Sequence, residues 1–432
     1  MDWKQYYESR LTTAEEAVGR IKSGDRVVLE HACGEPVYLV DKMVENAAAY
    51  RDVEIVHMVA MGKGAYCAPE QAEHFRHNSL FVGGSTRKAV ESGQGDFTPC
   101  FFFEIPRLFH TTLPVDVALV CVTPPNEQGK VSLGVSCDYT LEAVKSAKTV
   151  IAQVNPAMPY TCGATELPVE DIDVFVEHEQ PVIELPQGRI GDIEKAIGQN
   201  CATLIPDGAT LQLGIGAIPD AVLLFLKDKK DLGIHSEMFS DGVVELAEAG
   251  VITNAKKTLK PGKFVVTFLM GTKRLYDFVN NNPDVEMQPV DYVNDPFVVA
   301  QNDKLISINS CVQIDLMGQV ASESVGLKQI SGTGGQVDFV RGASASKGGV
   351  SIMAFPSTAA KGTVSKIVPF LDHGSAVTTC RCDVDYAVTE YGVAHLKGET
   401  LRQRARNLIA IAHPDFRAPL IEEFEKRFHC AF

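Results

Sequence analysis

One acidic residue could carry the chemistry of this chain. Glu237 lies between apolar neighbours in GIHSEMFSDG, residues 233–242, with His235, Ser236 and Asp241 in the same predicted loop. Open α/β sheets concentrate their functional side chains in loops beyond the strand ends. A carboxylate there can attack a substrate as a nucleophile, bind a ribose hydroxyl or simply face solvent. The stretch alone leaves these three roles open.

A glycine-rich turn comes before this acid. The stretch LQLGIGAIPD, residues 211–220, follows a predicted strand and opens a predicted helix, so its backbone N–H groups could hold a phosphate or a developing oxyanion. A dinucleotide-binding turn has the pattern G-x-G-x-x-G, and Pro219 replaces the third glycine here. Glu237 follows Gly214 by 23 residues, about where such folds place their ribose-binding acid. An NAD-dependent oxidoreductase is therefore one alternative.

A second glycine-rich turn opens the stretch SGTGGQVDFVRGA, residues 331–343. Gly334 and Gly335 would let the backbone approach a ligand closely, and VDFV, residues 337–340, predicts a strand after the turn. A lysine in Walker A spacing does not follow, which argues against nucleotide hydrolysis. The turn is either a ligand-binding loop or a simple connection.

The elements that would position these residues occur twice. Residues 12–47 predict helix, turn, strand, turn and helix, and residues 191–228 predict the same order. Gly24 in the first segment corresponds to Gly208 in the second, at an offset of 184. The chain therefore consists of two related halves.

The remaining apolar segments predict further strands in both halves. They are separated by helical or glycine-rich stretches, a pattern that favours largely parallel, covered sheets. The strand candidates are VEIVHMVA, VDVALVCVT, TVIAQVN, KFVVTFLM, KLISINS and YAVTEYG. We predict an α/β fold of two similar open domains, residues 1–188 and 189–432, followed at the end by two helices broken at Pro414.

The repeat also selects residues in the first half. His31 and Glu35, in LEHACGEPVYLV, stand at the turn equivalent to LGIGAIP, which suggests a shared cleft. Two basic pairs, Arg87 with Lys88 and Lys273 with Arg274, could bind phosphates. Most such pairs are merely solvated, and most histidines at strand ends are structural.

Composition excludes several classes of partner. The net charge of −15 argues against binding to nucleic acid or to an anionic membrane, since both require a basic surface. Neither a signal peptide nor a membrane-spanning run is predicted, so we expect a cytoplasmic protein. The eleven cysteines form no CxxC pair and the histidines no HExxH motif, so no metal site is expected.

Four stretches in the same order resemble the family I coenzyme A transferases and their acetyl-CoA hydrolase relatives. The stretches are GIGAIPDAV, HSEMFSDG, SGTGGQVDFVRG and TEYGVAHLKGETLRQRARNLIAIAHPDFR, and the resemblance spans nearly the whole chain. Within the family, the chain is most similar to the 4-hydroxybutyrate branch, with the butyryl-CoA:acetate branch close to it. Met238 after the acid departs from the S/G-E-N-G form of the succinyl-CoA branch and favours the acetyl-CoA hydrolase-like branch.

This resemblance implies two α/β domains with the active site at their interface. It implies that Glu237 is the catalytic nucleophile, that Asn294 supplies an active-site amide, and that Gly335 supplies an oxyanion-binding N–H. It further implies a carboxylate-substrate pocket lined by His31, Glu35 and Gln212 and bordered by the loop of Ile215 and Gly216. Because coenzyme A is a polyanion and the protein is acidic, we predict a coenzyme A site formed by glycine-turn amides and local basic residues: Gly214, Ile215, Gly216, Gly334, Lys273 and Arg274. A homodimer or dimer of dimers without a resident cofactor is expected, acting either as a transferase or, with water as acceptor, as a hydrolase.

Overall fold

The computed structural model describes residues 2–432, and these divide into two compact units. The first unit contains the chain up to Leu185 together with Val265–Val293, and the second contains Pro186–Phe264 and Asn294–Phe432. The predicted division at residue 188 places Val265–Val293 in the second half, whereas this segment packs with the first unit. The reason is a strand pairing, because β16 (Val285–Met287) lies parallel to β8 (Cys162–Gly163).

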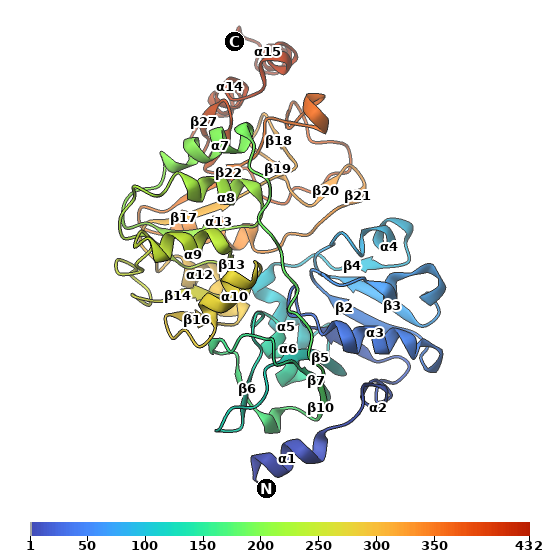
Figure 1. The fold of residues 1–432 in the computed structure, drawn as a ribbon. Coiled ribbons are helices and arrows are strands. Elements are labelled where there is room, and N and C mark those ends of the chain that lie inside the picture. Colours follow the sequence, from blue (N-terminus) through green and yellow to red (C-terminus); the bar gives the residue numbers. More distant parts are fainter. Residues whose placement is uncertain (1) are drawn as a thin grey trace. The chain divides into compact units, whose positions relative to one another are not determined.

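The first unit is built on a seven-stranded sheet in the order β10-β7-β5-β1-β2-β3-β4 (Figure 1). All neighbouring strands run parallel. The strands are β1 (Arg26–Leu29), β2 (Val53–His57), β3 (Phe75–Ser79), β4 (Asp96–Phe97), β5 (Val117–Val122), β7 (Thr149–Val154) and β10 (Val174–Glu177). Every residue of β5 is buried, as expected for a parallel sheet that is covered on both faces.

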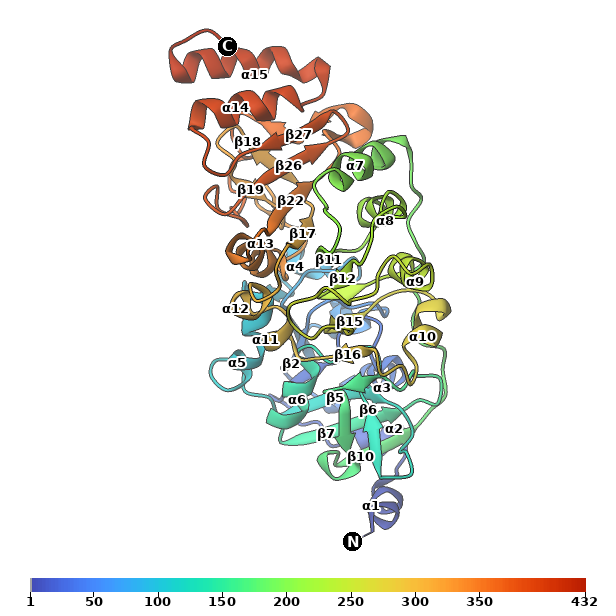
Figure 2. The ribbon, with the colours of Figure 1, turned by 90° about the vertical axis from the view of Figure 1, so that its left-hand side faces the viewer.

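Helices cover both faces of this sheet. Figure 2 shows α2 (Ala14–Val18) and α3 (Val37–Glu45) on one face and α5 (Ile105–Phe109) and α6 (Thr140–Ser146) on the other. The apolar residues of α2 and α3 form one core cluster with β1 and β2. The remaining helices of this unit are α1 (Trp3–Arg10), α4 (Arg87–Ser92), α10 (Lys273–Val279) and α11 (Val290–Val293).

The second unit has a similar sheet in the order β13-β11-β17-β22-β26-β27, with β12 beside β11. The four strands from β11 to β26 are parallel, while β13 and β27 are antiparallel to their neighbours. The strands are β11 (Thr210–Leu213), β12 (Gly233–Ile234), β13 (Met238–Phe239), β17 (Leu305–Asn309), β22 (Val350–Ala354), β26 (Tyr386–Thr389) and β27 (Gly392–His395). The predicted α/β fold with largely parallel sheets is confirmed.

Helices cover this second sheet in the same way. Figure 2 shows α7 (Asp192–Ala202), α8 (Ala217–Leu224) and α9 (Asp241–Glu248) on one face, with α12 (Pro296–Val299) and α13 (Gln336–Ala345) on the other. The chain ends with α14 (Leu401–Ala410) and α15 (Pro414–Phe428), which are separated at Pro414 as predicted. The predicted repeat is confirmed, since α2-β1-α3 in the first unit corresponds to α7-β11-α8 here.

One strand prediction is wrong, and another is confirmed only in part. VDFV is helical, because Gly335 is the N-cap of α13 and the apolar side chains of Val337, Phe339 and Val340 are all buried in the helix. KFVVTFLM is extended as predicted, but not as one continuous strand. It forms two short strands, β14 (Phe264–Val266) and β15 (Phe268–Leu269), and β14 joins β16 and β8 in a small separate sheet.

We predict that Gly198→Ala destabilises the second unit. A Cβ at this position of α7 would lie 2.7 Å from the backbone carbonyl carbon and oxygen of Ala221 in α8, and backbone cannot give way as a flexible side chain does. Overpacking of this kind costs about 1–3 kcal/mol, against at most about 1 kcal/mol gained from the helix propensity of alanine. The free energy of unfolding, measured in urea, gives the net effect of overpacking and helix propensity. Gly84→Ala is the control, because no atom of the described residues lies within 4 Å of its Cβ position, and an equal effect of both changes would contradict the prediction.

Candidate active site

Glu237 lies in the short connection between β12 and β13, at the carboxyl end of β11. The connection is pinned by Ser236, whose hydroxyl donates to the carbonyl of Met238 at 2.6 Å and accepts from the N–H of Leu213 at 3.2 Å. Ser236 is buried, whereas Glu237 is partly exposed. The loop therefore presents the carboxylate at the sheet edge where open α/β folds bind their ligands.

Glu237, Asn294 and Gly335 come together at this edge, although they are far apart in sequence. The fully buried Asn294 donates from Nδ2 to Oε2 of Glu237 at 2.9 Å. Gly335 lies directly beneath the same carboxylate, because a Cβ on it would be 1.8 Å from Oε2 of Glu237 and 2.4 Å from Nδ2 of Asn294. Only a glycine leaves room for this packing.

The N-terminus of α13 faces this cluster. Gly335 is the N-cap of the ten-residue helix and Asp338 follows in its first turn. A helix N-terminus carries a partial positive charge and free N–H groups, so it favours a nearby carboxylate or oxyanion. The site therefore offers an amide donor and a helix terminus around one partly exposed carboxylate.

The glycine turn before α13 is anchored by the side chain of Gln336. Its Oε1 accepts from the hydroxyls of Ser322 at 2.8 Å and Thr379 at 2.9 Å, and its Nε2 donates to the carbonyl of Ser310 at 2.7 Å. Gly334 has φ of +53°, a conformation that glycine adopts without strain. These contacts hold Gly335 in place from three separate segments.

The first glycine turn borders a neighbouring pocket of about 300 Å³ within the second unit. Gly216 has φ of +109° and caps α8, while Ile215 is 48% exposed. The pocket lies at the carboxyl ends of β11, β17 and β22 and is lined by Glu194, Gly214, Ile215, Ala217, Ile218, Pro219, Ile308, Asn309, Ser310 and Ala354. Gly214 and Ile215 thus line a cavity, as a ligand-binding turn requires.

Gln212 belongs to a buried amide network close to this pocket. Its Oε1 accepts from the Ser307 hydroxyl at 2.7 Å and from Nδ2 of Asn309 at 3.1 Å. Asn309 also lines the pocket. The side chain of Gln212 is therefore committed to holding Asn309, and its role against a substrate remains a prediction.

In the first unit, His31 forms a buried pair with Asp138. Nδ1 of His31 lies 2.7 Å from Oδ2 of Asp138, and both side chains are essentially inaccessible. Asp138 also accepts from the hydroxyl of Ser136 at 3.0 Å and the backbone N–H of Tyr139 at 2.6 Å. These donors suit an ionised carboxylate, which then requires the hydrogen of His31 on Nδ1. Asp138 is not recognisable from the sequence, because the single acid in SCDYT belongs to no motif with a characteristic spacing.

Glu35 pins a loop of the same unit. Its Oε2 accepts from the backbone N–H groups of Met61 at 3.0 Å and Gly62 at 2.7 Å, and the residue is 2% exposed. Burial raises the pKa of Glu35 to about 7, although the two N–H groups oppose this shift. Its contacts are those of a structural acid, and substrate binding by Glu35 remains a prediction.

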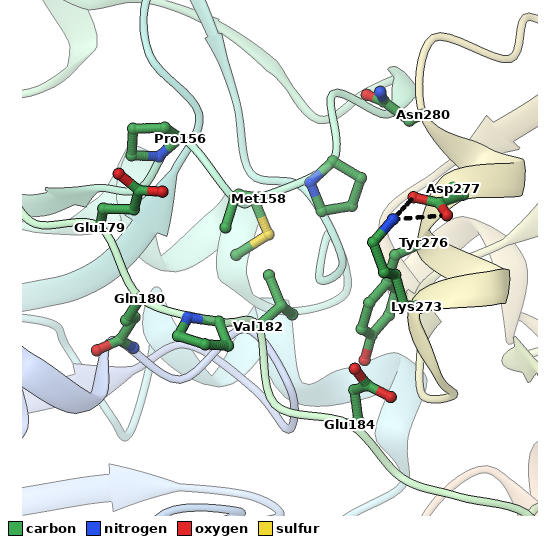
Figure 3. Close-up of a pocket in the computed structure, with 13 residues that line it drawn as sticks. Pro156, Met158, Glu179, Gln180, Val182, Glu184, Lys273, Tyr276, Asp277 and Asn280 are labelled. Atoms are coloured by element: carbon green, nitrogen blue, oxygen red, sulfur yellow. Dashed lines mark hydrogen bonds and ion pairs between the residues drawn. The ribbon is translucent and has the colours of Figure 1, made fainter.

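Lys273 and Arg274 begin α10, and Lys273 lines a pocket of about 700 Å³ in the first unit (Figure 3). Nζ of Lys273 is paired with both oxygens of Asp277, at 2.6 and 2.7 Å. Glu179 and Glu184 also line this pocket, with Met158 and Val182 among its apolar residues. An acidic surrounding is poorly suited to phosphates, so binding of coenzyme A by Lys273 gains no support from these contacts, and binding by Arg274 remains a prediction.

The sequence predicts neither a metal site nor a membrane-spanning helix, and both expectations can be compared with the described residues. Within residues 2–432, three or more histidine, cysteine, aspartate or glutamate side chains do not gather in the arrangement that a metal ion requires. Among the helices of the same residues, none is both long and apolar enough to cross a bilayer.

Two largely parallel sheets, one of them carrying a glutamate held by an amide over a glycine at a helix N-terminus, are compatible with an enzyme of the acyl-transfer class. Two family models match the chain, the acetyl-CoA hydrolase/transferase N-terminal domain over residues 1–185 and the C-terminal domain over residues 271–424. The chain belongs to the acetyl-CoA hydrolase/transferase family.

Individual relatives agree with this assignment. A 4-hydroxybutyrate coenzyme A transferase of Clostridium kluyveri is 65% identical over 99% of this chain and 100% of its own length. The crystal structure of a 4-hydroxybutyrate CoA-transferase from Porphyromonas gingivalis matches with a TM-score of 0.85 at 47% identity, over 99% of this chain and 100% of that one. An acetyl-CoA hydrolase of Candida glabrata is more distant, at 26% identity over 98% of this chain and 89% of its own.

We predict that Gly335→Ala removes activity without unfolding the chain. The added methyl would occupy the position of the Glu237 carboxylate, so that carboxylate must move, and a misplacement of about 1 Å can cost about 100-fold in rate. Steady-state kinetics measure the turnover, and a thermal melt measures the stability of the fold. Gly342→Ala is the matched control. Gly342 lies on α13, like Gly335, but outside the cluster, and its Cβ would lie 2.3 Å from the side chain of Val299. It should lower stability and retain turnover; equal turnover losses in both variants would contradict the prediction.

Proposed function

We propose that this enzyme moves CoA between an acyl-CoA (acetyl-CoA or butyryl-CoA) and a short-chain carboxylate such as 4-hydroxybutyrate, butyrate or acetate. Family membership and 65% identity with a named CoA transferase make it an acyl-CoA:carboxylate CoA-transferase. The observation that supports a covalent mechanism is the contact of 2.9 Å between Asn294 and the carboxylate of Glu237, above Gly335. A homodimer or dimer of dimers in the cytoplasm stays a prediction.

In the proposed reaction, one protein carboxylate relays CoA between two acids. Glu237 attacks the thioester carbonyl, the carbon–sulfur bond breaks, and an acyl-glutamyl anhydride and CoA thiolate are formed. The thiolate then attacks the glutamyl carbonyl, releases the first acid as its carboxylate and leaves a glutamyl-CoA thioester. The second acid repeats these steps in reverse, which gives ping-pong kinetics. A resident cofactor is not required, since thioester and anhydride carbonyls are already activated.

Each attack produces a tetrahedral oxyanion that needs N–H donors already in place. Nδ2 of Asn294 is at hydrogen-bond distance from Oε2 of Glu237, the atom that becomes the glutamyl carbonyl oxygen. The N-terminus of α13 at Gly335 adds a favourable potential. Donors that are fixed before the reaction stabilise the transition state without reorganisation.

Hydrolysis is the alternative, with water in place of the second carboxylate. It would use the same glutamate, and the family includes relatives that are named as hydrolases. The named transferases are much closer in sequence, which favours transfer. The NAD-dependent oxidoreductase alternative receives no support from the family.

We predict a CoA adduct on Glu237. After incubation with acetyl-CoA, the mass of the intact protein and of the peptide containing Glu237 should rise by the mass of one CoA less one water, and borohydride should remove the adduct by reducing the thioester. Adding acetate or 4-hydroxybutyrate should discharge it. Glu237→Ala should form none, and Glu237→Asp should react about 100-fold more slowly, because its carboxylate is one methylene too short.

Glu245→Ala is the control for this experiment, because Glu245 lies exposed on the neighbouring helix α9, where its carboxylate pairs with Lys227. It should form the adduct normally. An unmodified Glu237 with steady CoA release in the absence of a carboxylate would favour hydrolysis. An adduct that forms on Glu237→Ala would contradict the assignment of the nucleophile.

We also predict that Asn294→Ala lowers turnover by about 100-fold to 1000-fold, the usual effect of removing one oxyanion donor. The Michaelis constant for acyl-CoA should change little, because the donor acts mainly on the transition state. Steady-state kinetics with a thermal melt as control provide the measurement. A folded Asn294→Ala protein with unchanged turnover would refute the donor role.

A further inference from the structure

The amide of Asn294 bridges two acids. Besides Oε2 of Glu237 at 2.9 Å, its Nδ2 donates to Oδ2 of Asp338 at 3.5 Å. Asn294 is fully buried, and its Oδ1 has no hydrogen-bond partner among residues 2–432. Both acceptors are therefore found on the nitrogen side of the amide.

This arrangement fixes which way the amide faces. The oxygen and nitrogen of an asparagine side chain are nearly equal in size, so packing alone does not distinguish the two orientations. An ionised carboxylate only accepts hydrogen bonds. Two carboxylates on the same side thus require the NH₂ group there, whereas a flipped amide would place its oxygen against both.

Asp338 is suited to remain charged while it is buried. It is 1% exposed and is the third residue of α13, in the first turn after the N-cap Gly335. A buried carboxylate is expensive unless hydrogen-bond donors or a positive potential compensate it; Nδ2 of Asn294 is one donor to Asp338, and the N-terminus of α13 supplies a positive potential. Because Asp338 and Gly335 belong to the same helix end, their positions relative to each other are fixed.

The charge on Glu237, by contrast, changes during the proposed reaction. In the anhydride and in the thioester the glutamyl group is neutral, and it accepts hydrogen bonds more weakly than a carboxylate does. At those stages Glu237 no longer holds the amide strongly, while the next attack still needs an N–H beside its carbonyl oxygen. Another fixed acceptor must then keep the amide from turning.

We propose that Asp338 is this positioning residue, which keeps Nδ2 of Asn294 directed at the Glu237 carbonyl while Glu237 is acylated. The inference rests on the proposed function. When the second acid attacks the glutamyl thioester, its oxygen bonds to the carbonyl carbon and the electron pair of the C=O bond moves to oxygen. That oxyanion receives the N–H of Asn294, then collapses to the anhydride as the carbon–sulfur bond breaks and CoA thiolate leaves.

The test is a double-mutant cycle between Asp338→Asn and Asn294→Ala, measured as turnover. Asp338→Asn keeps the shape of the side chain and removes the charge that selects the amide orientation. We expect turnover to fall about 10-fold to 100-fold, less than on removal of the donor itself, with the Michaelis constant for acyl-CoA within about twofold. In the Asn294→Ala background, Asp338→Asn should have no further effect, because residues that act through each other are not additive.

Several outcomes would overturn the inference. Unchanged turnover of Asp338→Asn would do so, as would multiplicative losses in the double mutant, which would show that Asp338 acts independently of Asn294. If Asp338→Asn does not fold, Asp338→Ser replaces it, since serine is tolerated in the first turn of a helix, and the same cycle applies. Asp295→Asn is the matched control. Asp295 is adjacent to Asn294 and caps α12 through the N–H of Phe297 at 2.8 Å, a role that asparagine also fills, so turnover should be retained.

The adduct measurement separates this inference from the proposed function. If the parent protein exchanges CoA but forms no adduct on Glu237, the covalent mechanism fails whatever the cycle shows. If the parent forms and discharges the adduct, and Asp338→Asn discharges it as fast as the parent, only the positioning role fails. Slow discharge with the adduct still formed is the result that supports the inference.

Discussion

The candidate site depends on the hydrogen bond between Asn294 and Glu237 across Gly335. It joins the β12–β13 connection, the segment before α12 and the N-terminus of α13, which are separated by dozens of residues in sequence. The contact exists only because position 335 has no side chain, since a Cβ would fall 1.8 Å from the carboxylate. Much of the surrounding structure can be understood as support for that contact. Ser236 holds one side of it and Gln336 the other.

The parallel sheet explains why the β12–β13 connection and the N-terminus of α13 lie at the same edge. In a parallel sheet all carboxyl ends lie along one edge, so the turn after β11, the loop beside it and the segment after β17 are neighbours whatever their separation in the chain. The helices that follow such strands start at the same edge and direct their N-termini toward it. An anionic nucleophile with oxyanion intermediates is well placed there. The overall charge of −15 makes this local potential more important, since the protein surface as a whole does not attract anionic acyl-CoA.

Much of this was predictable from the sequence, for identifiable reasons. The repeat, the parallel strands and the loop around Glu237 follow from apolar periodicity and glycine positions, which are local properties. VDFV was misassigned because four apolar or acidic residues fit a strand as well as a helix, and only the packing of α13 decides between them. The position of Val265–Val293 was missed because strand pairing with Cys162–Gly163 is a long-range event. Asp138 and Asp338 were not assigned roles, since their partners, His31 and Asn294, lie 107 and 44 residues away.

The contacts of Asn294 with Glu237 and Asp338 also bear on the chemical role of Glu237. Nδ2 of Asn294 donates to Oε2 of Glu237 and lies within hydrogen-bond distance of Oδ2 of Asp338. Such a donor supports an ionised carboxylate in the resting enzyme and an oxyanion during the reaction, the two charged forms that a nucleophilic glutamate passes through. The same donor would hinder a carboxyl group that had to retain a proton. The amide of Asn294 beside Glu237, above Gly335, is thus an arrangement that the proposed relay of CoA through Glu237 would require.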